Sequence, residues 1–282
     1  MRRIESLDGL RAIAVGSVIA SHLLAGYGID AGNLGWGGVY VFFAISGYVI
    51  TRTLVADDIN LRRFYIRRAF RILPAMWLYL AVVYALGFAG FEVLPAAAFL
   101  CNTRIAGCTW NVAHTWSLAF EEQFYLVYPA LLAALLLRRR LPWLIVPAVL
   151  FAVLPFVFPI HWIGRRGFVE VYALLGMGAF FAFHPVRVPR FLTRPLELAP
   201  LPYIGRISYS LYLWQQLFTG ESVPVAWHPA GVAAAIVISM ASFHAFERLF
   251  QENGRRLAAR QGLEGPRPSG DPEAGLGGQD SS

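Results

Sequence analysis

The chain reads His114-Thr-Trp-Ser-Leu-Ala-Phe-Glu-Glu-Gln-Phe-Tyr-Leu-Val-Tyr-Pro129 near its middle, where two adjacent glutamates interrupt a hydrophobic run. A carboxylate near the centre of a bilayer costs roughly 2.5–3.5 kcal/mol on insertion scales, and such groups usually face a cavity and serve a function. Helical spacing places five polar side chains on one face: His114, Ser117, Glu121, Tyr125 and Tyr128. The stretch therefore predicts an apolar helix with a functional polar stripe.

The composition is that of a membrane protein. Of 282 residues, 57% are hydrophobic and only 15% are charged, against about 25% charged in soluble domains. Apolar segments of about 18–25 residues recur, which predicts an all-α, polytopic transmembrane helical bundle of about eight spans. The first segment lacks a small-residue cleavage site and is expected to remain as a span. The predicted spans are residues 7–27, 35–56, 68–90, 112–137, 141–160, 168–184, 201–220 and 229–250.

The distribution of arginine predicts the orientation. All 24 basic residues are arginine, and they cluster at residues 2–3, 52–71, 138–140, 187–194 and 248–267. The loops on the opposite side hold only Arg104, Arg165 and Arg166. Because positive charge is retained in the cytoplasm, both termini are expected there. The net charge of +7 is explained by these short loops and does not indicate a nucleic-acid partner.

The chain is expected to form one transmembrane domain over residues 1–260, followed by a disordered cytoplasmic tail over residues 261–282. A weaker apolar piece at residues 91–101 predicts a short interfacial or re-entrant helix. Cys101 and Cys108 lie in one loop. They could form a disulfide if that loop is extracytoplasmic, or remain two separate thiols, and their spacing is not that of a metal site.

The first predicted span carries Asp8, Arg11 and His22. Eleven residues separate Arg11 from His22, close to three helical turns, so both project from one face about 16 Å apart. Asp8 lies one turn before Arg11 and could pair with it. The alternative is that Asp8 and Arg11 are interfacial anchors and His22 is a core histidine. The rise per residue places His22 and Glu121 in a similar outer layer, where a carboxylate could orient a histidine base.

Two further polar groups allow either a functional or a structural interpretation. Arg67, Arg68 and Arg71 are spaced to share a helix face, where guanidinium groups suit phosphates, or they are cytoplasmic anchors. Tyr212 shares a face of the seventh span with Ser208 and Gln215. That face could line the same cavity or join helices through hydrogen bonds.

The motifs, in their order along the chain, resemble those of the acyltransferase-3 family, integral-membrane O-acyltransferases of the O-antigen acetylase type. The resemblance extends from residue 6 to about residue 250. Each motif is weak alone, and five in order are specific. The motifs are Asp8-Gly-Leu-Arg11 with His22, Val41-Phe-Phe-Ala-Ile-Ser-Gly-Tyr-Val-Ile-Thr51, Phe64-Tyr-Ile-Arg-Arg-Ala-Phe-Arg71, His114-Thr-Trp-Ser-Leu-Ala-Phe-Glu-Glu-Gln-Phe-Tyr125 and Ile207-Ser-Tyr-Ser-Leu-Tyr-Leu-Trp214.

The resemblance implies that an acyl group, usually acetyl, moves from cytoplasmic acyl-CoA to a glycan hydroxyl outside a bacterial inner (plasma) membrane. His22 matches the family's catalytic histidine, and Arg68 and Arg71 match its Arg-x-x-Arg motif for the donor. Glu121 and Glu122 match its paired glutamates. No permanently bound cofactor or metal is implied.

Two departures from the family pattern bear on these expectations. The family typically has about ten spans, whereas the link from Phe183 to Leu201 is short here. The family usually follows Tyr-Leu-Trp with histidine, where this chain has Gln215, so a proton-transfer role at that position is open.

We therefore expect an acyl-CoA-dependent O-acyltransferase in which His22 and Glu121 are catalytic. A covalent acyl intermediate on Ser46, on Ser117 or on a residue of a periplasmic loop is an alternative. The alternative function is a multi-pass transporter or flippase for an anionic or acylated substrate, although the repeated halves of many transporters are not visible. An inactive scaffold is disfavoured by the intact His22 and Glu121. The expected substrate-binding residues are Asp8, Arg11, Arg67, Arg68, Arg71, His114, Ser117, Glu122, Tyr125 and Tyr212.

Overall fold

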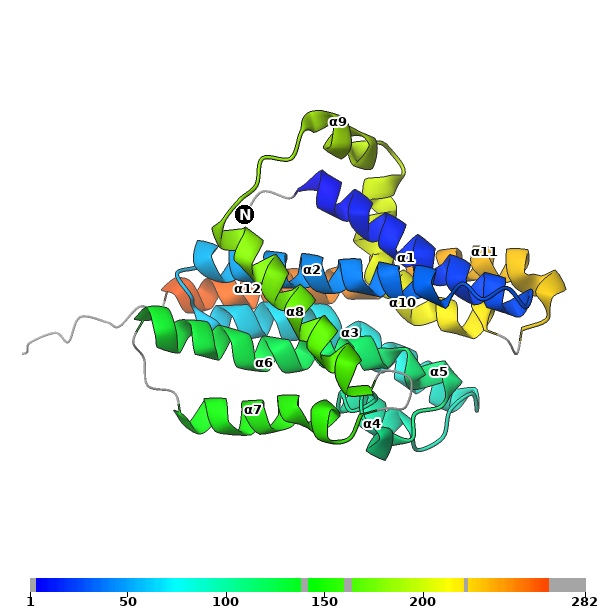
Figure 1. The fold of residues 1–282 in the computed structure, drawn as a ribbon, viewed down its shortest axis with the longest axis horizontal. Helices are drawn as coiled ribbons and strands as arrows, with labels where there is room; N and C mark the ends of the chain where they lie inside the picture. The colour runs from blue at the N-terminus through cyan, green and yellow to red at the C-terminus, as the bar shows by residue number, and fades with distance from the viewer. Residues whose placement is uncertain (1–3, 138–141, 160–163, 221–222, 264–282) are drawn as a thin grey trace, which may run out of the picture.

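Long helices lie side by side in a computed structural model of the chain (Figure 1). The structure describes residues 4–137, 142–159, 164–220 and 223–263. Over these ranges the only β-type pairing is an isolated bridge between Thr103 and Pro159. The predicted all-α fold is confirmed.

Within the described residues, eight long helical segments overlap the spans that the sequence predicts. They are α1 (Glu5–Gly26), α2 (Gly32–Ala56), α3 (Leu61–Ala85), α6 (Thr115–Leu137), α7 (Pro142–Val157), α8 (Gly164–Phe183), α10 (Leu201–Thr219) and α11 (His228–Ala241), which continues through a π-helical segment (η4, Ser242–Glu247) into α12 (Arg248–Leu263). Short elements connect them: α4 (Val93–Ala97), η1 (Arg104–Ala106), α5 (Trp110–Ala113), α9 (Arg190–Thr193), η2 (Arg194–Glu197) and η3 (Val225–Trp227).

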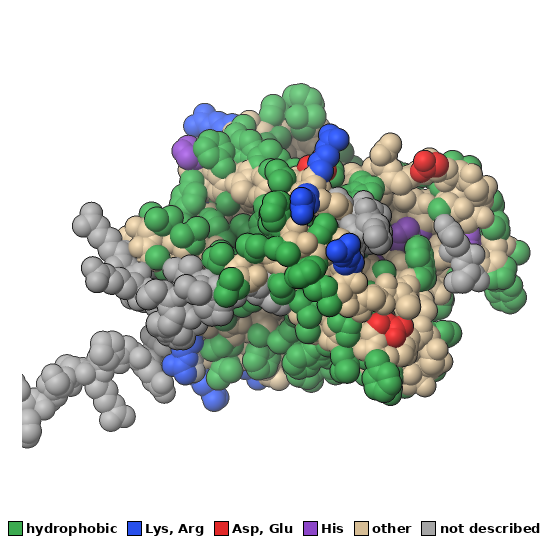
Figure 2. All heavy atoms as spheres, turned by 60° about the horizontal axis from the view of Figure 1, so that its bottom comes forward, with side chains coloured by type: hydrophobic (Ala, Val, Ile, Leu, Met, Phe, Trp, Pro, Cys, Tyr) green, Lys and Arg blue, Asp and Glu red, His purple; other side chains and the backbone are tan. Residues whose placement is uncertain are grey.

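Several of these segments are long and apolar enough to cross a membrane. Within the described residues they are α1, α2, α3, α8 and the continuous helical stretch Val225–Arg260. Figure 2 shows hydrophobic side chains over much of one face of the molecule. A polytopic helical membrane protein is therefore confirmed, whereas the number of spans and the side of the termini stay predictions.

Glycines let the central helices approach closely. A Cβ atom on Gly205 of α10 would lie 1.7 Å from the carbonyl oxygen of Asp8 in α1. One on Gly178 of α8 would lie 2.0 Å from that of Ala44 in α2. Small residues at such crossings are typical of helices that pack in membranes. As a result α1 packs mainly on α10 and α2, and α2 packs mainly on α8 and α1.

The two ends of the bundle differ in chemistry. The arginine-rich end, where α3 begins, carries Arg62, Arg63, Arg67, Arg68 and Arg71. The disulfide end carries α4, α5 and the disulfide bond between Cys101 and Cys108. The two cysteines are therefore paired and are not separate thiols. Figure 1 shows α4 and α5 at the opposite end of the bundle from the C-terminal end of α6.

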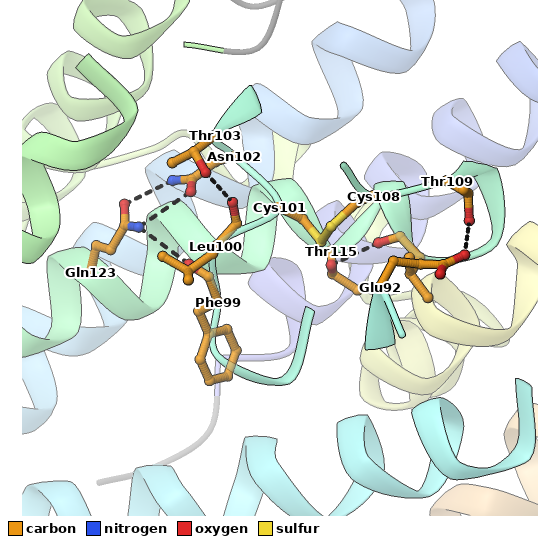
Figure 3. The surroundings of a disulfide bond; sticks show 11 residues. Glu92, Phe99, Leu100, Cys101, Asn102, Thr103, Cys108, Thr109, Thr115 and Gln123 are labelled. Atoms are coloured by element: carbon orange, nitrogen blue, oxygen red, sulfur yellow. Dashed lines mark hydrogen bonds between the residues drawn. A yellow bond between two sulfur atoms is a disulfide. The ribbon is translucent and has the colours of Figure 1, made fainter. Parts of the chain in front are cut away.

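The disulfide lies within a network of side-chain hydrogen bonds (Figure 3). Asn102 donates to Gln123 of α6 over 2.8 Å, and Thr109 donates to Glu92 over 2.7 Å. The bond from Thr109 lowers the pKa of the Glu92 carboxyl below its usual value. The predicted short helix in residues 91–101 is present as α4, and these bonds attach the loop after it to the helices.

Two expectations concern segments near the C-terminus. Between α8 and α10 the chain contains only the short α9 and η2, so the link is as short as the sequence indicates. Helix α12 continues to Leu263. The rest of the predicted tail, residues 264–282, lies outside the described residues.

Candidate active site

Three adjacent cavities follow one another through the bundle. We call them the His22 cavity, the central cavity and the arginine cavity, with volumes of about 330, 80 and 190 Å³. The His22 and central cavities share Val39 and Tyr212 as lining residues. The central and arginine cavities share Arg68 and Arg71. The three cavities therefore lie next to one another between His22 and the arginine cluster.

The His22 cavity is aromatic and carries few polar groups. Trp36 of α2, Trp110 of α5 and Trp116 of α6 line it together with His22. The His22 ring meets Trp110 edge-on at a centroid distance of 5.4 Å, and its Nδ1 lies 3.0 Å from Oε1 of Gln215. Ligand pockets are typically apolar with a few placed polar groups. The His22 cavity has the composition of a ligand pocket, with His22 among its few polar groups.

Glu121 lies in the central cavity and forms an organised polar group there. It accepts hydrogen bonds from Ser46 of α2 over 2.9 Å and from Tyr125 one turn further along α6 over 2.7 Å. The guanidinium of Arg68 stacks over the Tyr125 ring at 4.0 Å and interacts electrostatically with Glu121 and Glu122. These contacts orient Arg68 toward the cavity.

Arg11 also lines the central cavity. Its guanidinium lies 3.1 Å from the carboxylate of Asp8, which is buried, so the pairing that the sequence allows is confirmed. The Asp8 backbone is covered by α10 at Gly205. Arg11 is therefore held at the crossing of α1 and α10, facing the cavity.

Tyr212 stands between the central and His22 cavities. Its hydroxyl lies 2.7 Å from Oγ of Ser117 and 2.9 Å from the carbonyl oxygen of His114. All three side chains are buried, and His114 lies at the junction of α5 and α6. The His114 ring packs on Tyr79 and Tyr212 at 5.3 and 5.6 Å, and neither of its nitrogens has a hydrogen-bond partner.

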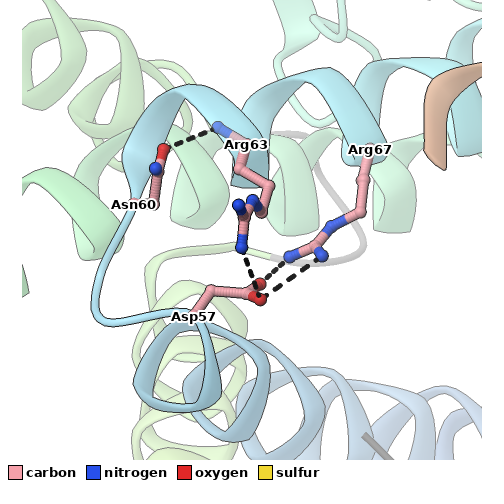
Figure 4. Close-up of polar contacts among 4 residues, drawn as sticks. All are labelled: Asp57, Asn60, Arg63 and Arg67. Carbon is pink, nitrogen blue, oxygen red and sulfur yellow. Dashed lines mark hydrogen bonds and ion pairs between the residues drawn. The ribbon is translucent and has the colours of Figure 1, made fainter. Parts of the chain in front are cut away.

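The three arginines of the predicted phosphate site differ in their partners. Arg67 and Arg63 both contact the carboxylate of Asp57, and the Asn60 side chain caps α3 by accepting from the Arg63 amide over 3.0 Å (Figure 4). Arg68 instead stacks on Tyr125, interacts electrostatically with Glu121 and Glu122, and has a buried Nε without a hydrogen-bond partner. Arg71 interacts electrostatically with Glu247 of η4. Arg255 of α12 lines the same cavity as these residues. The arginine cavity can therefore hold an anionic group, with the charge of Arg67 partly compensated.

The expected pairing of His22 with Glu121 is wrong. His22 contacts Gln215, whereas Glu121 contacts Ser46 and Tyr125 in a different cavity. The depth estimate assumed that the first and fourth predicted spans are neighbours, but α1 packs mainly on α10 and α2. The depth of a residue along its helix predicts its level in the membrane but does not predict which helix lies beside it.

The remaining predicted residues divide between the cavities. Ser117 and Ser208 line the central cavity, and His114 lines the His22 cavity. Glu122 has a buried carboxylate oxygen without a hydrogen-bond partner. Tyr128 lies 2.8 Å from the Thr51 hydroxyl on α2, so it joins helices.

The sequence interpretation missed Asp57 and the three tryptophans of the His22 cavity. Tryptophan near a span end is ordinarily an interfacial anchor, so the sequence offered no reason to choose these three. Asp57 lies at the start of the turn between α2 and α3, and Arg67 lies in α3 beyond that turn. Helical periodicity applies within one helix and therefore does not predict their contact. In the described part of the chain no cluster of three or more His, Cys, Asp or Glu side chains could hold a metal ion.

Residues 4–173 match the acyltransferase-3 family, whose model is described as an acyltransferase domain. The chain belongs to this family. The matched residues include α1, α2, α3 and α6, with Arg11, His22, Arg68 and Glu121, whereas Tyr212 and Gln215 of α10 lie beyond them.

Curated relatives include proteins named for O-acetyl transfer. Over 166 residues the chain is 38% identical to a Staphylococcus aureus (strain COL) protein with a provisional O-acetyltransferase name, covering 50% of this chain and 26% of that protein. It is 33% identical over 181 residues to the peptidoglycan O-acetyltransferase OatA of Listeria monocytogenes, covering 52% and 27%. The alignments thus span about a quarter of these relatives' length. No solved structure matches the chain.

Proposed function

We propose that this chain is an integral-membrane O-acyltransferase that moves an acyl group, acetyl in the first instance, from acyl-CoA to a glycan hydroxyl. The observation that supports it most is the row of cavities from the arginine cluster to His22. Such a row suits a long donor with phosphates at one end and a thioester at the other. Family membership supports acyl transfer over the transporter alternative.

The donor would enter from the arginine-rich end. Its phosphates would contact Arg68, Arg71 and Arg255, because guanidinium groups bind phosphate through paired hydrogen bonds and these three line the arginine cavity. The pantetheine arm would run through the central cavity past Arg11 and Glu121. The thioester would then reach Tyr212, which borders the His22 cavity.

The acceptor would occupy the His22 cavity. The apolar faces of a sugar ring pack well on aromatic side chains, and three tryptophans line this cavity. His22 Nε2 would take the proton of the acceptor hydroxyl as its oxygen attacks the thioester carbonyl. The tetrahedral intermediate would expel the CoA thiolate, which takes the proton back from the imidazolium. Arg11 or Tyr212 would stabilise the developing negative charge.

The orientation is part of the proposal. The arginine-rich end and both termini would face the cytoplasm of a bacterial inner membrane, and the disulfide end would face outward, where disulfides persist. Membrane-impermeant thiol labelling tests this in a Cys101→Ser/Cys108→Ser background. A cysteine introduced at the exposed Asn60 should react only after the membrane is permeabilised, and one at the exposed Ile105, in the loop closed by the disulfide, should react in intact cells. Labelling of position 60 in intact cells would contradict the orientation and the donor placement.

The activity is tested with purified protein in lipid vesicles, radiolabelled acetyl-CoA and peptidoglycan or lipid-linked sugar fragments. We expect alkali-labile label on the glycan, and its rate of appearance should fall by about 10²–10⁴-fold with the His22→Ala protein. Mass spectrometry of surface glycans from a deletion strain would identify the natural acceptor. Label that never reaches any glycan, together with CoA-independent flux of an anion across the vesicles, would favour the transporter instead.

A further inference from the structure

A chain of hydrogen bonds on α10 ends at the side chain of His22. Nδ1 of His22 lies 3.0 Å from Oε1 of Gln215. The same oxygen accepts from the Thr219 hydroxyl over 2.7 Å, and the Gln215 amide nitrogen donates to Oε1 of Gln216 over 3.2 Å. The Gln216 amide nitrogen in turn donates to the backbone carbonyl of Trp110 over 3.0 Å.

The direction of this chain is fixed at its far end. A backbone carbonyl only accepts hydrogen bonds, so the Gln216 amide nitrogen must face the Trp110 carbonyl and its oxygen must face Gln215. Only the amide nitrogen of Gln215 can donate to that oxygen. The oxygen of Gln215 therefore faces His22, and rotating this amide by 180° would set two amide oxygens against each other.

We infer that Gln215 is a positioning residue that holds His22 in the tautomer with hydrogen on Nδ1 and a free lone pair on Nε2. A carbonyl oxygen can only accept, so a neutral His22 must donate to it from Nδ1. Nε2 is then the unprotonated nitrogen, as a general base requires. The inference rests on the proposed function for its role in catalysis, whereas the tautomer itself does not depend on the reaction.

Glutamine also keeps this arrangement constant with pH, since its amide does not titrate in the physiological range. The other titratable groups that line the His22 cavity are His114 and Tyr212; α2 contributes aromatic and aliphatic side chains and Ser21 comes from α1. Among these described lining residues there is no carboxylate. The lining of the His22 cavity thus carries no charge beside His22, and replacing the Gln215 amide by a carboxylate introduces one negative charge there and removes the donor to Oε1 of Gln216.

The tautomer is measured directly by nitrogen NMR of histidine-labelled protein in lipid, with His22→Ala identifying the His22 signals. At neutral pH we expect Nδ1 of His22 to carry hydrogen and Nε2 to be unprotonated. Hydrogen on Nε2 in the wild-type protein would overturn the inference whether or not the protein transfers acyl groups.

Kinetics separate the role in catalysis from a role in folding. Gln215→Leu should lower kcat by roughly tenfold or more, yet less than loss of the base itself, which costs about 10²–10⁴-fold. Gln215→Glu keeps an acceptor at Nδ1 and should retain more activity, but it should move the acid limb of the pH–rate profile upward by roughly one pH unit or more, because a carboxylate stabilises the imidazolium.

The matched control is Gln123, a buried glutamine of α6 that bonds Asn102 and the Phe99 carbonyl away from the cavities. Gln123→Leu should leave kcat and the pH profile unchanged in folded protein. Wild-type kcat and an unshifted profile in both Gln215 variants, with His22→Ala inactive, would overturn the inference while the proposed function stands. Wild-type turnover in His22→Ala would instead refute the proposed role of His22.

Discussion

The arginine cavity and the His22 cavity lie in one bundle and have opposite chemistry. Arg67, Arg68, Arg71 and Arg255 line the first, whereas three tryptophans and two histidines line the second. The charges at the first are partly compensated by Asp57, and the polar atoms at the second are organised by neutral hydrogen bonds from α10. The contrast indicates that one end suits an anionic group and the other an uncharged one.

The central cavity lies between the arginine cavity and the His22 cavity and shares lining residues with each. Glu121 and Arg68 share it with Tyr125, and Tyr212 borders the His22 cavity on its far side. Glu121 bonds Ser46 and Tyr125, whereas His22 bonds Gln215, so these two side chains have separate hydrogen-bond partners. Substitutions at one end should therefore alter the kinetics of one substrate and leave those of the other unchanged, which the following experiments test.

Loss of His22 should have the largest effect. His22→Ala should lower kcat by about 10²–10⁴-fold, the usual contribution of a positioned base. The affinity for acyl-CoA should be unchanged, because the proposed site for its phosphates is the arginine cavity at the other end. The control is His184→Ala, an exposed histidine at the end of α8. Steady-state kinetics and acyl-CoA binding measure both quantities. A weaker affinity for acyl-CoA in folded His22→Ala protein would break the separation of the two ends.

Loss of the donor arginines should have the next largest effect. A hydrogen bond to a charged group contributes about 1.5–3 kcal/mol, so Arg68→Ala with Arg71→Ala should raise the acyl-CoA KM by roughly 100-fold or more. A lysine pair should restore part of it, since lysine keeps the charge and loses the paired geometry. Arg190→Ala, an exposed arginine on α9, is the control. An unchanged acyl-CoA KM in folded double-alanine protein would mean that these arginines only anchor the helix at the cytoplasmic side of the membrane.

The sequence predicted most of the fold because hydrophobic segments of membrane length are a strong local signal. It also predicted the pair of Asp8 and Arg11, whose spacing lies within one helix. The sequence did not predict the partners of His22 and Glu121. These partners depend on which helices are neighbours, and neighbours are set by close crossings such as that of Gly205 on Asp8. Hydrophobic periodicity within one helix carries no information on such crossings. The partner of His22, Gln215, lies 193 positions away in the chain.

A smaller effect is expected for Glu121, and it should fall on the donor. Glu121→Gln keeps the shape of the side chain but weakens the contacts that orient Arg68. We expect the acyl-CoA KM to rise by roughly 3–10-fold, in the range for one hydrogen bond, with kcat and the acceptor KM little changed. A double-mutant cycle with Arg68→Lys should show coupling, whereas one with Gln215→Leu should be additive. Coupling between Glu121 and Gln215 would mean that Glu121 acts together with His22, although the structure places the two side chains in different cavities.

Loss of the disulfide should have the smallest effect on the kinetics, and this effect should be confined to the acceptor. Cys101→Ser with Cys108→Ser opens a loop of seven-residue separation, and loop-closure entropy predicts a loss of about 2–3 kcal/mol in the free energy of unfolding. Trp110 lies two residues beyond Cys108 and exchanges hydrogen bonds with Gln216 of α10. Greater mobility there should raise the acceptor KM by roughly two- to fivefold, about 0.5–1 kcal/mol, and leave the acyl-CoA KM unchanged. Urea unfolding and two-substrate kinetics measure these quantities. An equal rise in both KM values would mean that the disulfide end and the arginine-rich end are mechanically coupled, and the two cavities would then have to be treated as one site.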